Sequence, residues 1–217
     1  MPTDSRERSP LAGEDGSDGA GFPRALARGQ AYLYVIACRD DSLFKVGYSR
    51  DPLQRFRTLH PRFFEFFDLG RGILVKTERV AQARRLEHAL HVAFAIHQAP
   101  APVCVPASAA GHTEWFRGVL DDAVHAAREQ ALHDAFAHEL PDAWLRSVLA
   151  QRKDLLFDWA CRVFEAIEYA EHNLAGAGVG VYMRTLCDVL DAYRMVGIDP
   201  CPLLPTHVGR WYAARAR

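Results

Sequence analysis

Three polar side chains that could take part in chemistry lie close together in the sequence: Tyr34, Lys45 and Arg55. A guanidinium stays charged near neutral pH, and its planar fork binds two phosphate oxygens at once. A phenol has a pKa of about 10, which falls when a cation lies within a few ångströms. Lys45 would be such a cation if it lies beside Tyr34. Each residue also has an ordinary explanation, namely packing for the tyrosine, solvation for the lysine, and pairing of Arg55 with Asp51.

Two strands and a helix would hold these side chains. Aromatic and β-branched residues typical of strands occur in two apolar runs separated by a short turn-like segment, 32–37 and 43–48. So short a link predicts an antiparallel pair. Asp51 is a good helix N-cap and Pro52 a good first helical residue, so a helix is predicted to begin there and to carry Arg55. A third strand is predicted over residues 72–76.

A fourth polar residue, Glu87, falls in the next predicted helix, which runs from Thr77 to about residue 97. The apolar residues of this helix recur at spacings of three and four, which places Glu87 on or beside the face that packs against the sheet. An inward carboxylate costs free energy unless it has a partner. That partner would be Arg84, a core histidine or a metal ion. Zinc is disfavoured, because Glu87, His88 and His91 do not form the HExxH pattern.

In order and spacing, these residues resemble the motifs of the GIY-YIG nuclease superfamily. The matching positions are Tyr34 for the first motif, Lys45-Val46-Gly47 for the second, and Arg55 and Glu87 on the following helices. Tyr32 stands where the first motif has glycine, and Lys45 where the second has tyrosine. Lysine before Val-Gly is similar to a phage- and bacteria-associated branch that also carries a Glu-Trp-Phe segment, present here as residues 114–116. The resemblance covers residues 31–117.

This resemblance implies an α+β fold, in which a small three-stranded antiparallel sheet is flanked by helices, and an activity as a metal-dependent DNA endonuclease. Tyr34 would be the general base, Lys45 the cation that lowers its pKa, and Arg55 the counter-charge for the phosphate. Glu87 would be the metal ligand for one Mg²⁺ or Mn²⁺ ion, whose charge assists the departing oxygen. The residues expected to contact DNA are Tyr32, Gly47, Tyr48, Arg57 and His60.

Charge is unevenly distributed along the chain, although the formal total is −1. Residues 30–117 contain 12 Lys/Arg and 8 Asp/Glu, a net charge of +4. Residues 118–217 contain 10 Lys/Arg and 14 Asp/Glu, a net charge of −4. The basic part suits a phosphate-bearing ligand, whereas the acidic part is a poor DNA clamp. The near-zero total argues against a non-specific polybasic binder.

Three regions are predicted along the chain: a disordered tail over 1–29, the nuclease module over 30–117, and a helical accessory domain over 118–217. The tail has too few bulky apolar residues to offset the entropy of ordering. Within the module, the Ala- and Pro-rich residues 99–113 are predicted to form a loop. The accessory domain is predicted to be all helical, with helices near 117–138, 142–174, 180–196 and 206–215.

The five cysteines are scattered and form no CxxC pair, which predicts reduced thiols. The sequence shows neither a signal peptide nor an apolar run that would span a membrane, so a cytoplasmic protein without membrane contact is expected. DNA is the expected partner, and residues 118–217 are expected to serve a homodimer or a protein partner. Two alternatives stay open. Instead of a nuclease, the chain would be either an inactive nucleic-acid-binding module of the same fold or an interaction protein that acts mainly through its helical half.

Overall fold

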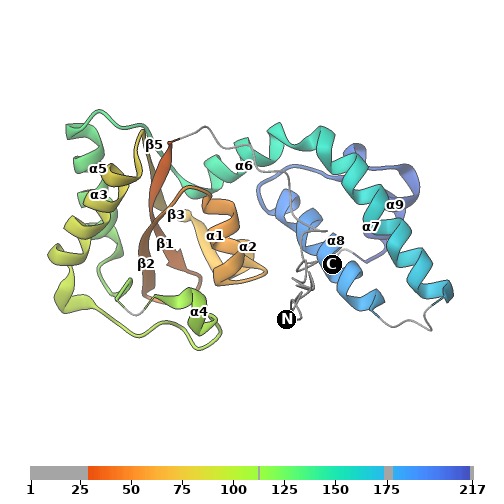
Figure 1. The fold of residues 1–217 in the computed structure, drawn as a ribbon, viewed down its shortest axis with the longest axis horizontal. Helices are drawn as coiled ribbons and strands as arrows, with labels where there is room; N and C mark the ends of the chain where they lie inside the picture. The colour runs from red at the N-terminus through yellow and green to blue at the C-terminus, as the bar shows by residue number, and fades with distance from the viewer. Residues whose placement is uncertain (1–28, 112, 174–177, 216–217) are drawn as a thin grey trace, which may run out of the picture.

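The computed structural model describes residues 29–111, 113–173 and 178–215. The predicted disordered tail, residues 1–29, lies outside this part of the chain except for Gly29. Figure 1 shows a sheet with helices on both faces, followed by a group of helices to one side. The described fold is therefore α+β with a helical C-terminal part, which confirms the predicted fold class.

Within the described ranges, five antiparallel strands form one sheet in the order β4-β2-β1-β3-β5. Their bounds are β1 Ala31–Cys38, β2 Leu43–Ser49, β3 Phe67–Thr77, β4 Trp115–Arg117 and β5 His138–Glu139. The predicted hairpin is confirmed, with Tyr34 opposite Gly47 and Ile36 opposite Lys45. The sheet has five strands rather than three because β4 and β5 add short edges of three and two residues. Strands this short leave no two-residue alternation to recognise in a sequence.

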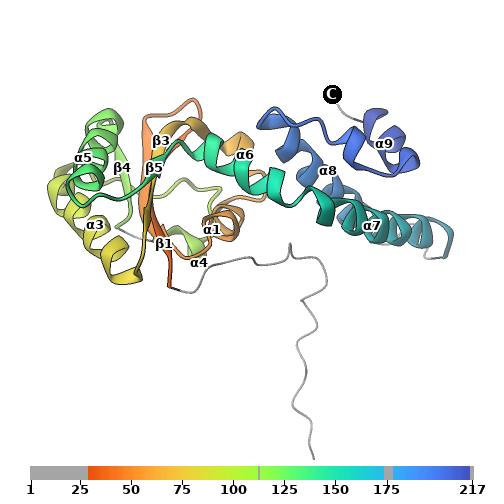
Figure 2. The same ribbon diagram turned by 90° about the horizontal axis from the view of Figure 1, so that it is seen from above.

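Both faces of the sheet are covered by helices (Figure 2). The covering helices are α1 Pro52–Leu59 and α2 Phe63–Phe66 on one face, and α3 Val80–Ala93 and α5 Leu120–His133 on the other. Successive residues of a strand point to opposite faces. Leu33 and Val35 of β1 therefore pack in the core under α3 and α5, whereas Tyr34 and Ile36 pack in the core under α1 and α2.

Local sequence signals account for the helix that carries Arg55. The Asp51 side chain accepts a hydrogen bond from the Gln54 backbone N–H at 3.0 Å, and Pro52 occupies the first turn of α1. The following helix, α3, begins at Val80, slightly later than the sequence suggested, and one further turn, η1 Ala95–His97, continues beyond it. On the predicted apolar face of α3, Ala83, Leu86 and Leu90 are buried, whereas Ala93 at its end is exposed.

The described residues of the helical C-terminal part form four further helices and one short turn, α6 Pro141–Gln151, α7 Lys153–Asn173, α8 Val179–Met195, η2 Cys201–Leu203 and α9 Thr206–Ala213. The single long helix predicted over 142–174 is instead two helices that meet at Arg152. Neither proline nor glycine marks this break. Helix α6 packs on β3 and α7 packs on α8, so tertiary packing turns the chain there.

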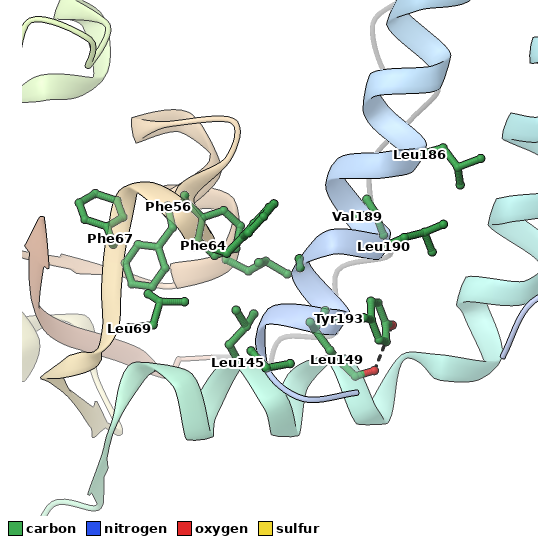
Figure 3. Packing of buried hydrophobic residues seen from close by; sticks show 14 of the residues in the cluster. Phe56, Phe64, Phe67, Leu69, Leu145, Leu149, Leu186, Val189, Leu190 and Tyr193 are labelled. Atoms are coloured by element: carbon green, nitrogen blue, oxygen red, sulfur yellow. Dashed lines mark hydrogen bonds between the residues drawn. The ribbon is translucent and has the colours of Figure 1, made fainter. Parts of the chain in front are cut away.

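One apolar core joins the sheet to these helices (Figure 3). Phe56 of α1 and Phe64 of α2 belong to the same cluster as Leu145 and Leu149 of α6 and Val189 of α8. Burying this much apolar surface together favours a single folded body over two loosely linked ones.

The predicted boundary after residue 117 falls between β4 and α5. In the structure α5 covers one face of the sheet and β5 pairs with β3, so residues up to Glu139 contribute to the sheet layer. The helix predicted over 117–138 stops at His133. Ala135 there takes a left-handed φ of 55°, which ends the helical path and turns the chain toward β5.

In the part of the chain that the structure describes, no helix is both long enough and apolar enough to cross a membrane. The five cysteines are free thiols, and Cys38 alone among them is buried.

Candidate active site

Tyr34 lies fully buried in the middle of β1, and its hydroxyl oxygen accepts a hydrogen bond from Arg55 Nε at 3.2 Å. The Phe56 ring meets the tyrosine ring edge-on, with centroids 5.3 Å apart. The strand partner of Tyr34 has to be glycine. A Cβ on Gly47 would lie 2.4 Å from the tyrosine hydroxyl. Gly47 therefore makes room for the Tyr34 ring, and its expected approach to a sugar-phosphate backbone stays a prediction.

Lys45 of β2 is also fully buried, and Nζ lies 2.5 Å from Glu114 Oε2. The ammonium also sits 5.0 Å from the centroid of the Trp115 ring, close enough for a cation–π contact. Burial lowers the pKa of Lys45 to about 8, although the hydrogen bond and the negative charge of Glu114 oppose this fall. The lysine is charged at neutral pH largely because the glutamate is there.

Arg55 reaches into the same cluster from α1. Besides its bond to Tyr34, its Nη2 lies 3.5 Å from Glu114 Oε2, so one carboxylate oxygen faces both cations. The ordinary pairing of Arg55 with the Asp51 side chain does not occur, because that carboxylate caps the helix at Gln54. About a quarter of the arginine side chain is exposed. Of the two cations, Arg55 is thus the one that an incoming anion can reach.

The cation that contacts the phenol is Arg55, whereas the Lys45 ammonium contacts Glu114, so no contact supports the expected role of the lysine in lowering the pKa of Tyr34. Burial raises the pKa of Tyr34 to about 12, and the charge and hydrogen bond of Arg55 offset part of that rise. The strand register explains the difference. Lys45 lies opposite Ile36, two residue pairs along the ladder from Tyr34, and its ammonium is held by Glu114.

Glu87 approaches the cluster from α3, on the opposite face of the sheet, and is half-buried. Burial raises the pKa of Glu87 to about 7, and the charge of Glu114 adds to the rise. The charges of Lys45 and Arg84 and a hydrogen bond from the Tyr48 backbone N–H lower it. Beyond Val46, whose N–H still bonds the Glu114 carbonyl, β2 continues to Tyr48, and the Glu87 side chain from α3 reaches the strand backbone there.

The predicted salt bridge between Glu87 and Arg84 is not formed. Arg84 instead donates from Nη2 and Nε to the Tyr48 hydroxyl, at 3.0 and 3.3 Å. Among the described residues Glu87 makes no ion pair, so its partial burial is compensated only by longer-range charge and the strand backbone. A half-buried carboxylate in this state is a good ligand for a cation.

The donor set fits one hard divalent ion better than zinc. In the described ranges no group of three or more His, Cys, Asp and Glu side chains could hold a metal ion. Zinc in proteins commonly has three or four such ligands, whereas Mg²⁺ often takes one or two carboxylates and fills its other positions with water and phosphate oxygens. Glu87, with the negative charge of Glu114 nearby, matches the second pattern.

Glu114 was not among the site residues predicted from the sequence, yet its carboxylate contacts both Lys45 and Arg55. Its backbone carbonyl accepts from the Val46 N–H at 2.9 Å, and the adjoining strand β4 pairs Trp115 with Lys45. Gly111 packs so closely that a Cβ there would lie 2.5 Å from the Glu114 carboxyl carbon. The Glu-Trp-Phe segment was the available signal, but only the sheet pairing reveals that it faces Lys45.

The segment that leads to Glu114 was predicted as a loop over residues 99–113. It contains one helical turn, α4 Ala107–Ala110, and two of its residues, Val105 and Ala109, are buried in the same core as Tyr34. The segment is thus packed onto the α1 side of the sheet, which explains why Tyr34 is inaccessible in this state.

The predicted DNA-contacting residues do not all gather at this site. Tyr48 does, because its backbone faces Glu87 and its hydroxyl binds Arg84. Tyr32 packs edge-on against Trp144 of α6, with centroids 5.9 Å apart, and the His60 ring stacks on Phe66 at 4.7 Å. Arg57 lines a pocket between α1 and α8.

Residues 31–138 match the family model described as the T5orf172 domain. This domain is found in phage and bacterial nuclease-related proteins. The matched range begins at the first residue of β1 and ends at the first residue of β5, so it includes all of the sheet except Glu139. No curated protein and no solved structure matches the chain.

Proposed function

We propose that residues 31–138 form a nuclease module of the GIY-YIG type, which hydrolyses phosphodiester bonds in DNA with the help of one Mg²⁺ or Mn²⁺ ion. The observation that most supports this is the convergence of Tyr34, Lys45, Arg55 and Glu114 into one contact network. Glu87 lies close enough for the charges of Lys45 and Glu114 to change its pKa. The match to a nuclease-related domain points in the same direction.

Phosphodiester hydrolysis needs positive charge for the phosphate oxygens, a base for the attacking water and stabilisation of the departing oxygen. Arg55 supplies the first need, because it is partly exposed and its fork can bind two oxygens. Lys45 is buried, so it acts through Glu114 rather than by touching the substrate. A divalent ion held by Glu87 would supply charge for the departing oxygen.

Tyr34 is protonated near neutral pH in this state, since its pKa is about 12. Burial is the main cause of that high pKa, and the negative charges of Glu114 and Glu87 add to it. Neutralising these carboxylates would lower the pKa of the phenol and so raise the fraction of phenolate, the form that can accept a proton. The hydrogen bond from Arg55 already favours the phenolate and holds its oxygen in place.

A second candidate function follows from the burial of Tyr34 and Lys45, both with no exposed surface. In a binding module without catalysis, the same network would be a structural core and the basic surface alone would contact DNA. Such a protein would bind DNA in a salt-dependent way and never cleave it. An interaction protein that acts through its helical half would do neither.

Cleavage of a panel of duplex, branched and single-stranded DNA, with Mg²⁺, Mn²⁺ or EDTA, separates these functions. Glu87→Gln keeps the size of the side chain but removes its charge, so we expect cleavage to fall by at least about 100-fold, as loss of one transition-state contact commonly costs. Mg²⁺ should raise the Tm of the natural protein and leave that of the variant unchanged.

Glu78→Gln is the matched control, because Glu78 is exposed just before the same helix. It should cleave normally. Near-normal cleavage by folded Glu87→Gln protein would contradict the metal site, and an unchanged Tm for the natural protein would do the same. Salt-dependent binding without cleavage by the natural protein would favour the binding module.

A further inference from the structure

Tyr48 connects the candidate active site to a neighbouring surface. Its backbone N–H is directed at Glu87, and its hydroxyl accepts two hydrogen bonds from the Arg84 guanidinium. The guanidinium carbon also lies 5.7 Å from the centroid of the Tyr48 ring. Three contacts to one side chain hold Arg84 in a defined position, although its side chain is exposed.

An open groove lies beside this pair, between the end of β2, the first turns of α1 and the start of α3. Three arginines line it together with neutral hydrogen-bonding side chains, and its lining includes Tyr48, Ser49, Arg50, Gln54, Arg55, Thr58 and Arg84. Arg55 is shared with the candidate active site, so the groove leads directly to the proposed chemistry.

The cations of this groove are available to a ligand. Among the residues that the structure describes, neither Arg50 nor Arg84 makes an ion pair, and the hydrogen-bond partner of Arg84 is a neutral phenol. The one acid in the lining, Asp51, has its carboxylate occupied by the helix cap at Gln54. A groove with unpaired guanidinium groups and hydroxyl or amide neighbours suits phosphate oxygens.

We propose that this groove binds the backbone phosphate next to the one that is cleaved, with Arg84 and Arg50 as its cations. The inference rests on the proposed function, because it assigns the track of the DNA strand into that site. A strand that crosses Arg84 reaches Arg55 along one continuous groove. The contact is to the phosphate backbone, so it contributes affinity and register but no base specificity.

Arg85 provides a matched control for Arg84. The two arginines are adjacent on α3 and both are exposed, but Arg85 pairs with Asp134 after α5, away from the groove. Both substitutions to glutamine remove one positive charge, so any general effect of net charge is the same. The difference in DNA affinity between the two variants therefore measures the contribution of the groove.

The test measures binding of the full chain to a labelled duplex in EDTA, at several salt concentrations. We expect Arg84→Gln to weaken binding about ten-fold and to reduce the slope of log K against log[salt] by about 0.9, the loss of one phosphate contact. Arg50→Gln should act in the same direction. Arg85→Gln should change the affinity less than two-fold and leave the slope almost unaltered.

Equal behaviour of Arg84→Gln and Arg85→Gln would overturn the groove while leaving the nuclease proposal intact. Absence of salt-dependent binding by the natural protein would instead overturn the proposed function, and the groove with it. If Arg84→Gln does not fold, Arg50→Gln decides the matter. The Arg50 side chain makes no ion pair among the described residues, and an unchanged affinity in that variant also counts against the groove.

Discussion

Glu114 is the residue on which both cations of the candidate site depend. One of its oxygens lies 2.5 Å from Lys45 Nζ and 3.5 Å from Arg55 Nη2. Removing one partner of a largely buried ion pair leaves the other charge poorly solvated, which costs more than the pair contributes. The stability of the site therefore depends on a side chain that reaches it from the far end of a long connecting segment.

We expect Glu114→Gln to lower the free energy of unfolding at pH 7 by about 2 kcal/mol, less than for a fully buried pair because the glutamate is partly exposed. The effect should depend on pH. Without Glu114 the pKa of Lys45 falls further below its present value of about 8, so the unfolded chain binds the extra proton at neutral pH. At pH 9 much of Lys45 is already neutral in the natural protein, and the deficit should shrink.

Denaturant unfolding at pH 7 and pH 9 measures this, with Glu78→Gln as the control. A deficit of equal size at both pH values would mean that Glu114 does not act through the charge of Lys45. The direction of this pH dependence follows because folding lowers the pKa of Lys45. Stability then rises with pH between about 8 and the unfolded value of about 10.4.

Arg55 and Lys45 should differ in how they affect the pH dependence of cleavage. Arg55 contacts the phenol, so Arg55→Gln removes a cause that lowers the pKa of Tyr34. The alkaline limb of the rate profile, where the rate rises as Tyr34 loses its proton, should therefore shift to higher pH. Lys45→Met should slow cleavage without moving that limb. Rates from pH 6 to pH 10 measure both effects. An alkaline shift in Lys45→Met would restore the role that the sequence alone had suggested.

At the scale of the elements, the sequence predicted what local rules control. The hairpin follows from two apolar runs, α1 from the Asp51-Pro52 start, and the half-buried position of Glu87 from the spacing of α3. These features depend on neighbours within one turn or one strand pair, where propensity and periodicity are informative.

Elements fixed by distant contacts escaped prediction. Strands β4 and β5 form only because the edges of β2 and β3 have unpaired backbone groups to offer. The break at Arg152 has no local cause, since it separates a helix that packs on the sheet from one that packs on α8. Glu114 was not assigned to the site for the same reason, because its contact with Lys45 depends on the pairing of β4 with β2.

At the scale of the whole molecule, the acidic helical half is attached to the sheet by charge as well as by the shared core. Arg62, in the turn between α1 and α2, pairs with Glu65 beside it and with Asp188 and Asp191 of α8, at 2.5, 2.5 and 2.9 Å. Tyr212 of α9 donates a hydrogen bond to Asp191 at 2.6 Å. The network thus joins the turn after α1, the helix that carries Arg55, to α8 and α9.

Arg62→Met tests whether this joint couples the two halves. The substitution keeps much of the length and apolar character of the side chain, but it leaves two carboxylates of α8 without their cation. We expect the free energy of unfolding to fall by about 1–2 kcal/mol in one cooperative transition, because the shared apolar core still unfolds with the sheet. Arg71→Met is the matched control. Arg71 lies 3.6 Å from Asp121, a residue that is almost fully exposed, so its loss should cost at most about 0.5 kcal/mol.

Denaturant unfolding followed by tryptophan fluorescence suits this test, because Trp115 lies in the sheet and Trp159 in α7. Cleavage at saturating DNA should be retained in Arg62→Met, since Arg62 touches none of the residues to which we assign chemistry. Equal stability losses in the two variants would show that the Arg62 network adds no more than a surface pair. Two separate transitions in the natural protein would mean that the sheet and the helices fold independently. The shared burial of Phe64 and Val189 argues for a single transition.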